Sequence, residues 1–328
     1  MKKAPKISTN AFKDTSALII GGFGFIGSNL ASRLINLGVN ITILTNTKKG
    51  LNELFGPKSK EIEIIEGDIR NYNLVRSLIR GKNFIFNISG YSGATDSLDR
   101  PFDHLSHNVL GHLTLLQSVV KSNPNVTVFF PSSQLVYGKP LYLPIKEDHR
   151  TEPNSLYGAN KLLCENYNKI YSSALGIKTV TFRISNPYGP RQKADFKYGL
   201  VSYFMSLAMN DRTITIYGKG SQKRSYIFID DLVEAILQAV LNKKTYGEVF
   251  NVSGKERNSV LEMAQIVVKS VGKGKISFVP WPEKAKKVET GDIYLNTRKI
   301  EKILSWKPAY SLKDGIEQTL KYFRKNNK

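Results

Sequence analysis

The segment ALIIGGFGFIGSNL, residues 17–30, decides the expected fold because it joins an apolar run to a glycine-rich turn. Gly21, Gly24 and Gly27 recur at intervals of three where the apolar residues end. Between a strand and a helix, the first glycine allows a tight turn, and the second lets a phosphate approach the backbone. The third lets the helix pack close to the strand, and the first helix amides, those of Phe25 and Ile26, would then be placed to bind a pyrophosphate. Alone, the motif is also compatible with a simple glycine-rich bend.

Short apolar runs alternate with helix-like segments along the chain. Strands are predicted over residues 17–21, 40–44, 62–65, 84–88, 126–130 and 178–184. Helices are predicted over residues 26–37, 73–79, 101–121 and 154–175. This alternation is typical of right-handed βαβ units on a parallel sheet. The sequence therefore predicts an α/β fold, with a Rossmann-type doubly wound parallel sheet.

The regular pattern ends near residue 185, where proline, glycine and tyrosine become more frequent. We expect a dinucleotide-binding Rossmann domain over residues 14–185, with residues 226–252 returning to its sheet. The strand and helix predicted over 226–241 belong to this return. Residues 186–225 and 253–320 are expected to form a smaller C-terminal substrate-binding region that closes over a site.

The composition of the 328 residues, 41% of them hydrophobic, is that of an ordinary globular chain. No apolar stretch reaches the roughly 18 residues of a spanning helix, so no membrane insertion is expected. The single cysteine, Cys164, excludes an internal disulfide and favours a cytoplasmic location. The net charge, 48 − 27 = +21, either attracts anionic partners or only aids solubility. The lysines are spread out and match no nucleic-acid-binding motif, so no specific nucleic-acid partner is predicted.

Polar residues after the second and third predicted strands are candidates for binding the adenosine of a dinucleotide. A carboxylate for the ribose is usual after the second strand, but this chain has Thr45 and Asn46, followed by Lys48. Either Thr45 and Asn46 bind a 2′-hydroxyl, or the lysine tolerates a 2′-phosphate. NAD is the expected cofactor, and NADP is the alternative. Asp68 and Ile69 are assigned to the adenine, with the Asp68 carboxylate accepting from its amino group or else capping a helix.

Three residues form a candidate catalytic group. In SLYGANK, Tyr157 and Lys161 are four residues apart and share one helix face. In PSSQLVYG, Ser133 lies just beyond a predicted strand, at the carboxyl edge where α/β sites form. Ser133 would bind the substrate oxygen and Tyr157 would move its proton. Lys161 would hold the nicotinamide ribose and lower the pKa of Tyr157, although an exposed helical pair is the alternative.

Motifs along nearly the whole chain, about residues 15–325, belong together. They are GGFGFIG (21–27), HNVLGHLTLLQSV (107–119), SSQLVYG (132–138), YGANK (157–161), RISNPYGPRQ (183–192), GKGSQKRSYIFIDDLVEAI (218–236), GEVFNVSG (247–254) and LSWKPAYSLKDGI (304–316). In these motifs the chain resembles the extended short-chain dehydrogenase/reductases, specifically the NAD-dependent epimerase/dehydratase family that acts on nucleotide sugars. The resemblance favours the cofactor-binding interpretation of the glycine turn.

The resemblance also implies a substrate site and a partner. Asn186 and Arg224 are expected to contact the diphosphate of a nucleotide sugar, and the guanidinium of arginine suits phosphate by its shape. A homodimer is expected, in which helices 101–121 and 154–175 pack as a four-helix bundle.

Two departures from the family pattern bear on the chemistry. Glu289 stands where the family often has an arginine that contacts phosphate, which weakens diphosphate binding unless Lys286 or Lys287 substitutes. The stretch Ser132-Ser133-Gln134 lacks the Asp-Glu pair that 4,6-dehydratases use to eliminate water. The second departure argues against dehydration.

The implied reaction is epimerisation of a nucleotide sugar at C4. Tyr157 would remove the 4-hydroxyl proton while hydride passes to NAD, and hydride would return to the other face of the 4-keto sugar. The enzymatic alternative is an NADPH-dependent reductase of 4-keto-deoxysugar nucleotides. An alternative of another class is a non-catalytic RNA-associated relative, which the net charge suggests but the catalytic group does not explain. His104, His107 and His112 are interpreted as structural, and no metal site is predicted.

Overall fold

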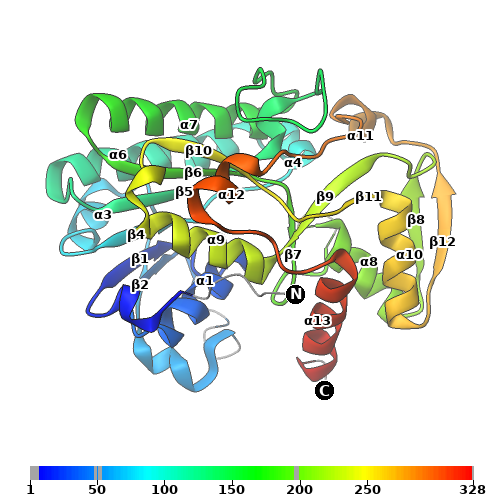
Figure 1. Ribbon diagram of the computed structural model, residues 1–328, viewed down its shortest axis with the longest axis horizontal. Helices are drawn as coiled ribbons and strands as arrows, with labels where there is room; N and C mark the ends of the chain where they lie inside the picture. Colours follow the sequence, from blue (N-terminus) through cyan, green and yellow to red (C-terminus); the bar gives the residue numbers. More distant parts are fainter. Residues whose placement is uncertain (1–6, 48–49, 51–53, 196–198, 327–328) are drawn as a thin grey trace.

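The computed structural model describes residues 7–47, 50, 54–195 and 199–326, which are organised about a large parallel sheet (Figure 1). Within these residues, seven strands pair in the order β10-β6-β5-β4-β1-β2-β3, and each pair is parallel. The strands are β1 (Ser16–Ile20), β2 (Asn40–Thr45), β3 (Ile62–Glu66), β4 (Phe84–Asn87), β5 (Thr127–Ser133), β6 (Lys178–Ile184) and β10 (Glu248–Val252). The predicted α/β fold with a doubly wound sheet is confirmed.

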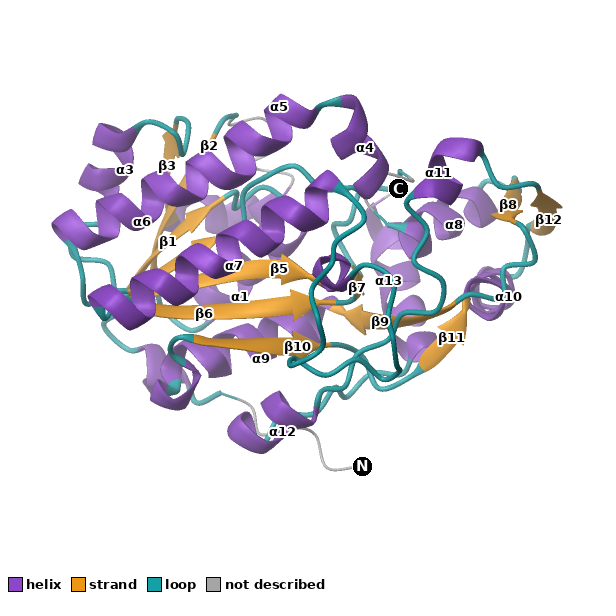
Figure 2. Cartoon of the chain, turned by 90° about the horizontal axis from the view of Figure 1, so that it is seen from above, coloured by secondary structure: helices purple, strands orange, loops and turns teal. Residues whose placement is uncertain are grey.

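Both faces of this sheet are covered by helices, which explains why apolar residues of its central strands point to both sides. In β1, Ala17 and Ile19 pack into one hydrophobic cluster, whereas Leu18 and Ile20 pack into the other. The first cluster includes residues of α1 (Phe25–Asn36) and α9 (Ile229–Leu241), and the second includes residues of α3 (Tyr72–Leu78), α6 (Gly111–Ser122) and α7 (Leu156–Leu175). Figure 2 shows α6 and α7 side by side over the sheet.

A smaller region lies beyond the carboxyl ends of the central strands (Figure 1). Its two sheets have the strand orders β11-β9-β7 and β12-β8. Its elements are β7 (Asn186–Tyr188), α8 (Leu200–Met209), β8 (Thr213–Tyr217), β9 (Lys223–Phe228), β11 (Arg257–Ser259), α10 (Val260–Val271), β12 (Lys275–Val279), α11 (Glu283–Lys287) and α13 (Leu312–Asn326). A further helix, α12 (Arg298–Leu304), lies beside β10. No helix among the described residues is long and apolar enough to span a membrane.

The predicted return of residues 226–252 to the large sheet needs one correction. The strand predicted from Tyr226 does not enter that sheet, because β9 pairs with β7 and β11 in the small region. The helix that follows, α9, does pack on the large sheet, and β10 then joins its edge beside β6. The chain therefore crosses from the small region to the large sheet within α9.

The helix predicted over residues 101–121 is interrupted. It consists of α5 (Pro101–His104), a π-helical segment (Leu105–Leu110) and α6, and it is preceded by the short helix α4 (Ala94–Asp99). At the interruption, the Asn108 side chain accepts a hydrogen bond from the Tyr91 amide (2.8 Å) and donates one to the Tyr91 carbonyl (3.0 Å). The wider π turn coincides with this bridge to the loop that follows β4.

Candidate active site

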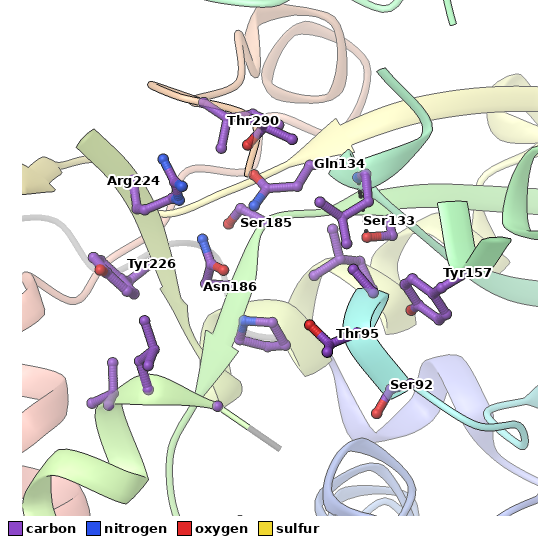
Figure 3. Close-up of a pocket in the computed structure, with 18 of the residues that line it drawn as sticks. Ser92, Thr95, Ser133, Gln134, Tyr157, Ser185, Asn186, Arg224, Tyr226 and Thr290 are labelled. Carbon is purple, nitrogen blue, oxygen red and sulfur yellow. Dashed lines mark hydrogen bonds between the residues drawn. The ribbon is translucent and has the colours of Figure 1, made fainter. Parts of the chain in front are cut away.

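A cavity of about 590 Å³ lies where the carboxyl ends of β4, β5 and β6 face the small region (Figure 3). Its wall includes Gly24 at the start of α1, Ser133 at the end of β5, and Tyr157 in the first turn of α7. Asn186 of β7 and Arg224 of β9 line it from the small region. The residues predicted to bind substrate and those predicted to catalyse thus share one cavity.

Regular elements hold the catalytic candidates in place. Strand β5 runs on to Ser133, beyond the predicted end, and the Ser133 hydroxyl then accepts a hydrogen bond from the Leu135 amide (3.2 Å). Ser155 caps α7 by accepting from the Gly158 amide (3.2 Å), so α7 begins just before Tyr157. A Cβ on Gly158 would lie 2.5 Å from the Leu135 carbonyl oxygen. The glycine therefore permits the close approach that brings Tyr157 to Ser133.

Tyr157 is half-buried in the cavity wall, and desolvation of its hydroxyl raises the pKa of the phenol to about 12, although a hydrogen bond with Ser133 opposes the shift. The sequence predicted that Lys161 lowers this pKa, and that role stays a prediction, because burial and the Ser133 hydrogen bond are the two influences on the phenol in the structure. The Lys161 ammonium lies 5.8 Å from the centre of the Tyr157 ring and donates instead to the Pro131 carbonyl, at 2.6 Å. Burial also lowers the pKa of Lys161 to about 8, which weakens its effect on the phenol.

A buried ion pair behind the catalytic residues did not emerge from the sequence. Arg183 of β6 and Glu165 of α7 form paired hydrogen bonds of 2.7 and 3.0 Å, and both side chains are buried. Glu165 also accepts from Ser132, and Arg183 donates to the Tyr137 hydroxyl (2.9 Å). The only available signal was that Glu165 follows Lys161 by four residues on the same helix face. The pair ties β5, β6 and α7 together beneath the cavity.

The glycine turn has the geometry that a bound pyrophosphate requires. Gly21 has φ +84°, and a Cβ there would lie 2.9 Å from the Ser89 backbone. A Cβ on Gly27 would lie 2.4 Å from the Gly21 carbonyl oxygen, so only glycine lets α1 begin so close to β1. Gly24 provides no side-chain cap, so the first amides of α1, including those of Phe25 and Ile26, have no partner inside the helix. This turn fits a dinucleotide.

Four of the residues predicted to bind adenosine lie outside this cavity: Thr45 ends β2, Asn46 follows it, and Asp68 and Ile69 follow β3. Thr45 is buried and donates to the Thr47 carbonyl (2.9 Å), whereas Asn46 is exposed. Lys48 falls outside the residues that the structure describes. Ile69 is buried, and a Cβ on Gly111 would lie 2.6 Å from its side chain.

The carboxylate of Asp68 is occupied by a neighbour. It accepts hydrogen bonds from the Arg70 amide (2.8 Å) and from the Arg70 guanidinium (2.9 Å), which lowers the pKa of Asp68. The alternative role as a helix cap is excluded, because Asn71 caps α3 by accepting from the Leu74 amide (3.1 Å). Binding of an adenine amino group stays a prediction for Asp68.

The substrate end of the cavity differs from what the family pattern implies. Asn186 donates to the Ser225 carbonyl (2.9 Å), which orients its side chain beside β9. Arg224, expected to contact a diphosphate, donates instead to the carboxylate of Glu289. Lys286 and Lys287, the suggested substitutes, lie on α11 but do not line the cavity. In the described structure Arg224 therefore has a carboxylate partner.

The three histidines of the interrupted helix have partners within the protein. His104 pairs with Asp96 (2.9 Å). His112 donates to Asn168 (2.8 Å) and accepts from Asn87 (3.0 Å), and burial lowers the pKa of His112 to about 4. His107 is hydrogen-bonded to the Asp103 carbonyl (3.0 Å). No group of three or more metal-binding side chains occurs among the described residues.

The sequence and the fold place the chain among known enzymes. The family model described as GDP-mannose 4,6 dehydratase matches residues 18–319, and the chain belongs to this family of extended short-chain dehydrogenase/reductases. A putative UDP-glucose 4-epimerase of Methanocaldococcus jannaschii is 32% identical over 313 residues, covering 95% of this chain and 99% of that protein. A CDP-paratose 2-epimerase of Salmonella typhi is 30% identical, covering 92% of this chain and 97% of that protein.

Solved structures of epimerases have the same fold as this chain. A UDP-glucose 4-epimerase of Thermotoga maritima, crystallised with UDP-glucose, superposes with a TM-score of 0.88 at 26% identity, covering 96% of this chain and all of that one. A UDP-glucose 4-epimerase of Thermus thermophilus, solved with NAD, gives a TM-score of 0.84 at 26% identity, covering 94% and 99%. The class is that of NAD-dependent nucleotide-sugar epimerases and dehydratases.

Proposed function

We propose that this protein inverts C4 of a nucleotide sugar through a 4-keto sugar, using NAD that stays bound. The observation that carries the proposal is the meeting of Ser133, Tyr157 and Lys161 at one cavity with the glycine turn. The 4-epimerases among the similar proteins support it. The NADPH-dependent reductase remains the alternative, favoured by the lack of a carboxylate at Thr45 and Asn46.

Each catalytic side chain has a separate task. The Ser133 hydroxyl binds the sugar O4, and the Tyr157 phenolate takes its proton and later returns it. Because burial holds the pKa of Tyr157 near 12, the phenolate needs stabilisation, which the Ser133 hydrogen bond and the Lys161 ammonium favour. Bound NAD would accept the hydride from C4 and give it back.

The proposed cofactor site uses the groups already described. The turn at Gly21, Gly24 and Gly27, with the Phe25 and Ile26 amides, would hold the pyrophosphate. Thr45, Asn46, Asp68 and Ile69 would hold the adenosine, and Tyr157 with Lys161 the nicotinamide ribose. Asn186 and Arg224 would bind the diphosphate of the sugar nucleotide.

Epimerisation is preferred to dehydration because of the two residues that follow Ser133. Elimination of water needs a further acid and base beside the sugar. Gln134 and Leu135 line the cavity at this place, and neither side chain ionises. Among the described residues, the one carboxylate on the cavity wall is that of Glu289, which is engaged by Arg224.

A homodimer is proposed for the assembled enzyme. Leu156, Leu163 and Ile170 are exposed at intervals of seven along α7, so they form one apolar stripe. Beside them, Phe102 is 82% exposed, and Leu105 is exposed as well. Sedimentation should give a dimer for the native chain and a monomer for Phe102→Glu. A native chain that sediments as a monomer would exclude the four-helix bundle.

Mass spectrometry of the nucleotides released by denaturing the purified protein tests the proposal. An equimolar amount of NAD supports a cofactor that is recycled in place, as epimerisation requires. A protein that releases no nucleotide on denaturation but binds NADPH in titration would instead support the reductase.

A further inference from the structure

The distribution of charge along the cavity is uneven. Among the residues that the structure describes, its wall carries three charged side chains: Lys161, Arg224 and Glu289. In Figure 3, Arg224 and Tyr157 lie on opposite sides of the cavity. The Lys161 ammonium is 5.8 Å from the centre of the Tyr157 ring, so it belongs to the Tyr157 side. At the end away from Tyr157, one cation and one anion thus face each other.

Arg224 is held by a turn formed by residues 289–292. Its guanidinium donates to the Glu289 carboxylate, to the Gly291 carbonyl and to the Lys223 carbonyl (3.0 Å). The Glu289 carboxylate also accepts from the Gly291 amide (3.0 Å), so it is fixed from two sides. The pair is only partly shielded from solvent, since the side chains are 12% and 25% exposed.

The lysines near this turn do not replace the missing arginine. Lys287 pairs with Glu283 of α11 (3.0 Å) while both side chains stay largely exposed, and Lys284 pairs with Asp99 of α4. Neither lysine lines the cavity. An anion that enters this end therefore meets a cation already neutralised by a carboxylate.

Building on the proposed function, we propose that Glu289 competes with the substrate diphosphate for Arg224 and so sets the affinity for nucleotide sugars. A guanidinium binds a carboxylate and a phosphate through the same paired N–H groups. Diphosphate binding must therefore displace the Glu289 carboxylate or accept its repulsion at close range. Glu289, which stands where the family often has an arginine, thereby sets how tightly the nucleotide sugar binds.

Titration calorimetry with UDP and with inorganic pyrophosphate tests the competition. Glu289→Gln keeps an oxygen for the Gly291 amide but removes the charge, and it should bind both probes about tenfold more tightly. Glu289→Ser should also bind more tightly. The control Glu283→Gln removes an exposed carboxylate on α11 and should leave both affinities unchanged. In an Arg224→Gln background, Glu289→Gln should no longer tighten binding.

Unchanged or weaker binding by Glu289→Gln, at an unaltered melting temperature, would overturn the competition. So would an absence of pyrophosphate binding in every variant. Pyrophosphate contains neither sugar nor base, so this result is independent of the proposed reaction. Tighter binding by Glu289→Gln without inversion of any sugar would refute the epimerase and leave the competition standing.

Discussion

At the Tyr157 end of the cavity, side chains are fixed by a strand end and a long helix, whereas at the Arg224 end they depend on a turn. Ser133 and Tyr157 rest on β5 and α7, which the buried Arg183–Glu165 pair joins from below. Arg224 and Glu289 are held to each other by a partly exposed ion pair. The Tyr157 end therefore holds its side chains in a fixed geometry. At the other end, the proposed competition requires that Arg224 can exchange the Glu289 carboxylate for a diphosphate.

The largest effect is expected for Tyr157→Phe, which removes the hydroxyl that moves the proton. Because general acid–base catalysis contributes about 10²–10⁴-fold, turnover should fall by about 10³-fold while NAD stays bound. Tyr142→Phe, in an exposed loop, is the control and should retain full activity. A Tyr157→Phe enzyme with more than a small fraction of native turnover would remove Tyr157 from its assigned role.

Breaking the buried ion pair should cost more stability than breaking an exposed one. Glu165→Gln leaves the Arg183 charge buried without a full partner, so the free energy of unfolding should fall by about 3–5 kcal/mol. Glu317→Gln removes the partner of Lys313 in an exposed pair on α13 and should cost about 0.5 kcal/mol or less. Urea unfolding measures the free energy of unfolding of both variants. Equal losses in the two would contradict the expected difference between the buried and the exposed ion pair.

The buried ammonium of Lys161 should make stability depend on pH in a defined window. Its pKa is about 8 in the folded state against an ordinary value of 10.5, so between these values the unfolded state binds more protons. The free energy of unfolding should therefore rise with pH from about 8 to about 10.5, by up to about 3 kcal/mol. Lys161→Met should lose this rise in urea titrations at several pH values. If the free energy of unfolding depended on pH in the same way in the native protein and in Lys161→Met, the burial of the Lys161 ammonium would be contradicted.

The smallest effect concerns the glycine turn. Gly27→Ala would place a Cβ 2.4 Å from the Gly21 carbonyl oxygen, so it should cost about 1–3 kcal/mol and reduce the NAD that copurifies. Gly24→Ala meets the same oxygen at 3.3 Å and should cost less. Equal stability for the two variants would show that the close contact of α1 with β1 is not required.

Sequence reasoning succeeded for structural features that local patterns and strand ends determine. The parallel sheet, the turn at Gly27, and the approach of Tyr157 to Ser133 all follow from local periodicity and from strand ends that share an edge. The α7 helix ends at Leu175, as predicted, and begins two residues after the predicted start at residue 154, where Ser155 caps it. These features need no knowledge of distant contacts.

The remaining features depend on pairings between distant segments. Strand β9 looks like any apolar strand, and only its partners place it outside the large sheet. The Arg183–Glu165 pair and the Arg224–Glu289 pair join residues from different elements, which spacing does not reveal. Burial, which raises the pKa of Tyr157, is likewise a property of the packed structure.

The most direct test of the account is to incubate the purified protein, without added cofactor, with UDP-glucose, UDP-N-acetylglucosamine and GDP-mannose, each deuterated at C4. Proton NMR and mass spectrometry would follow the products. The account predicts inversion at C4 of at least one sugar with the deuterium retained, because the hydride leaves and returns within one site. Loss of water, or no inversion of any sugar by protein that contains NAD, would contradict it.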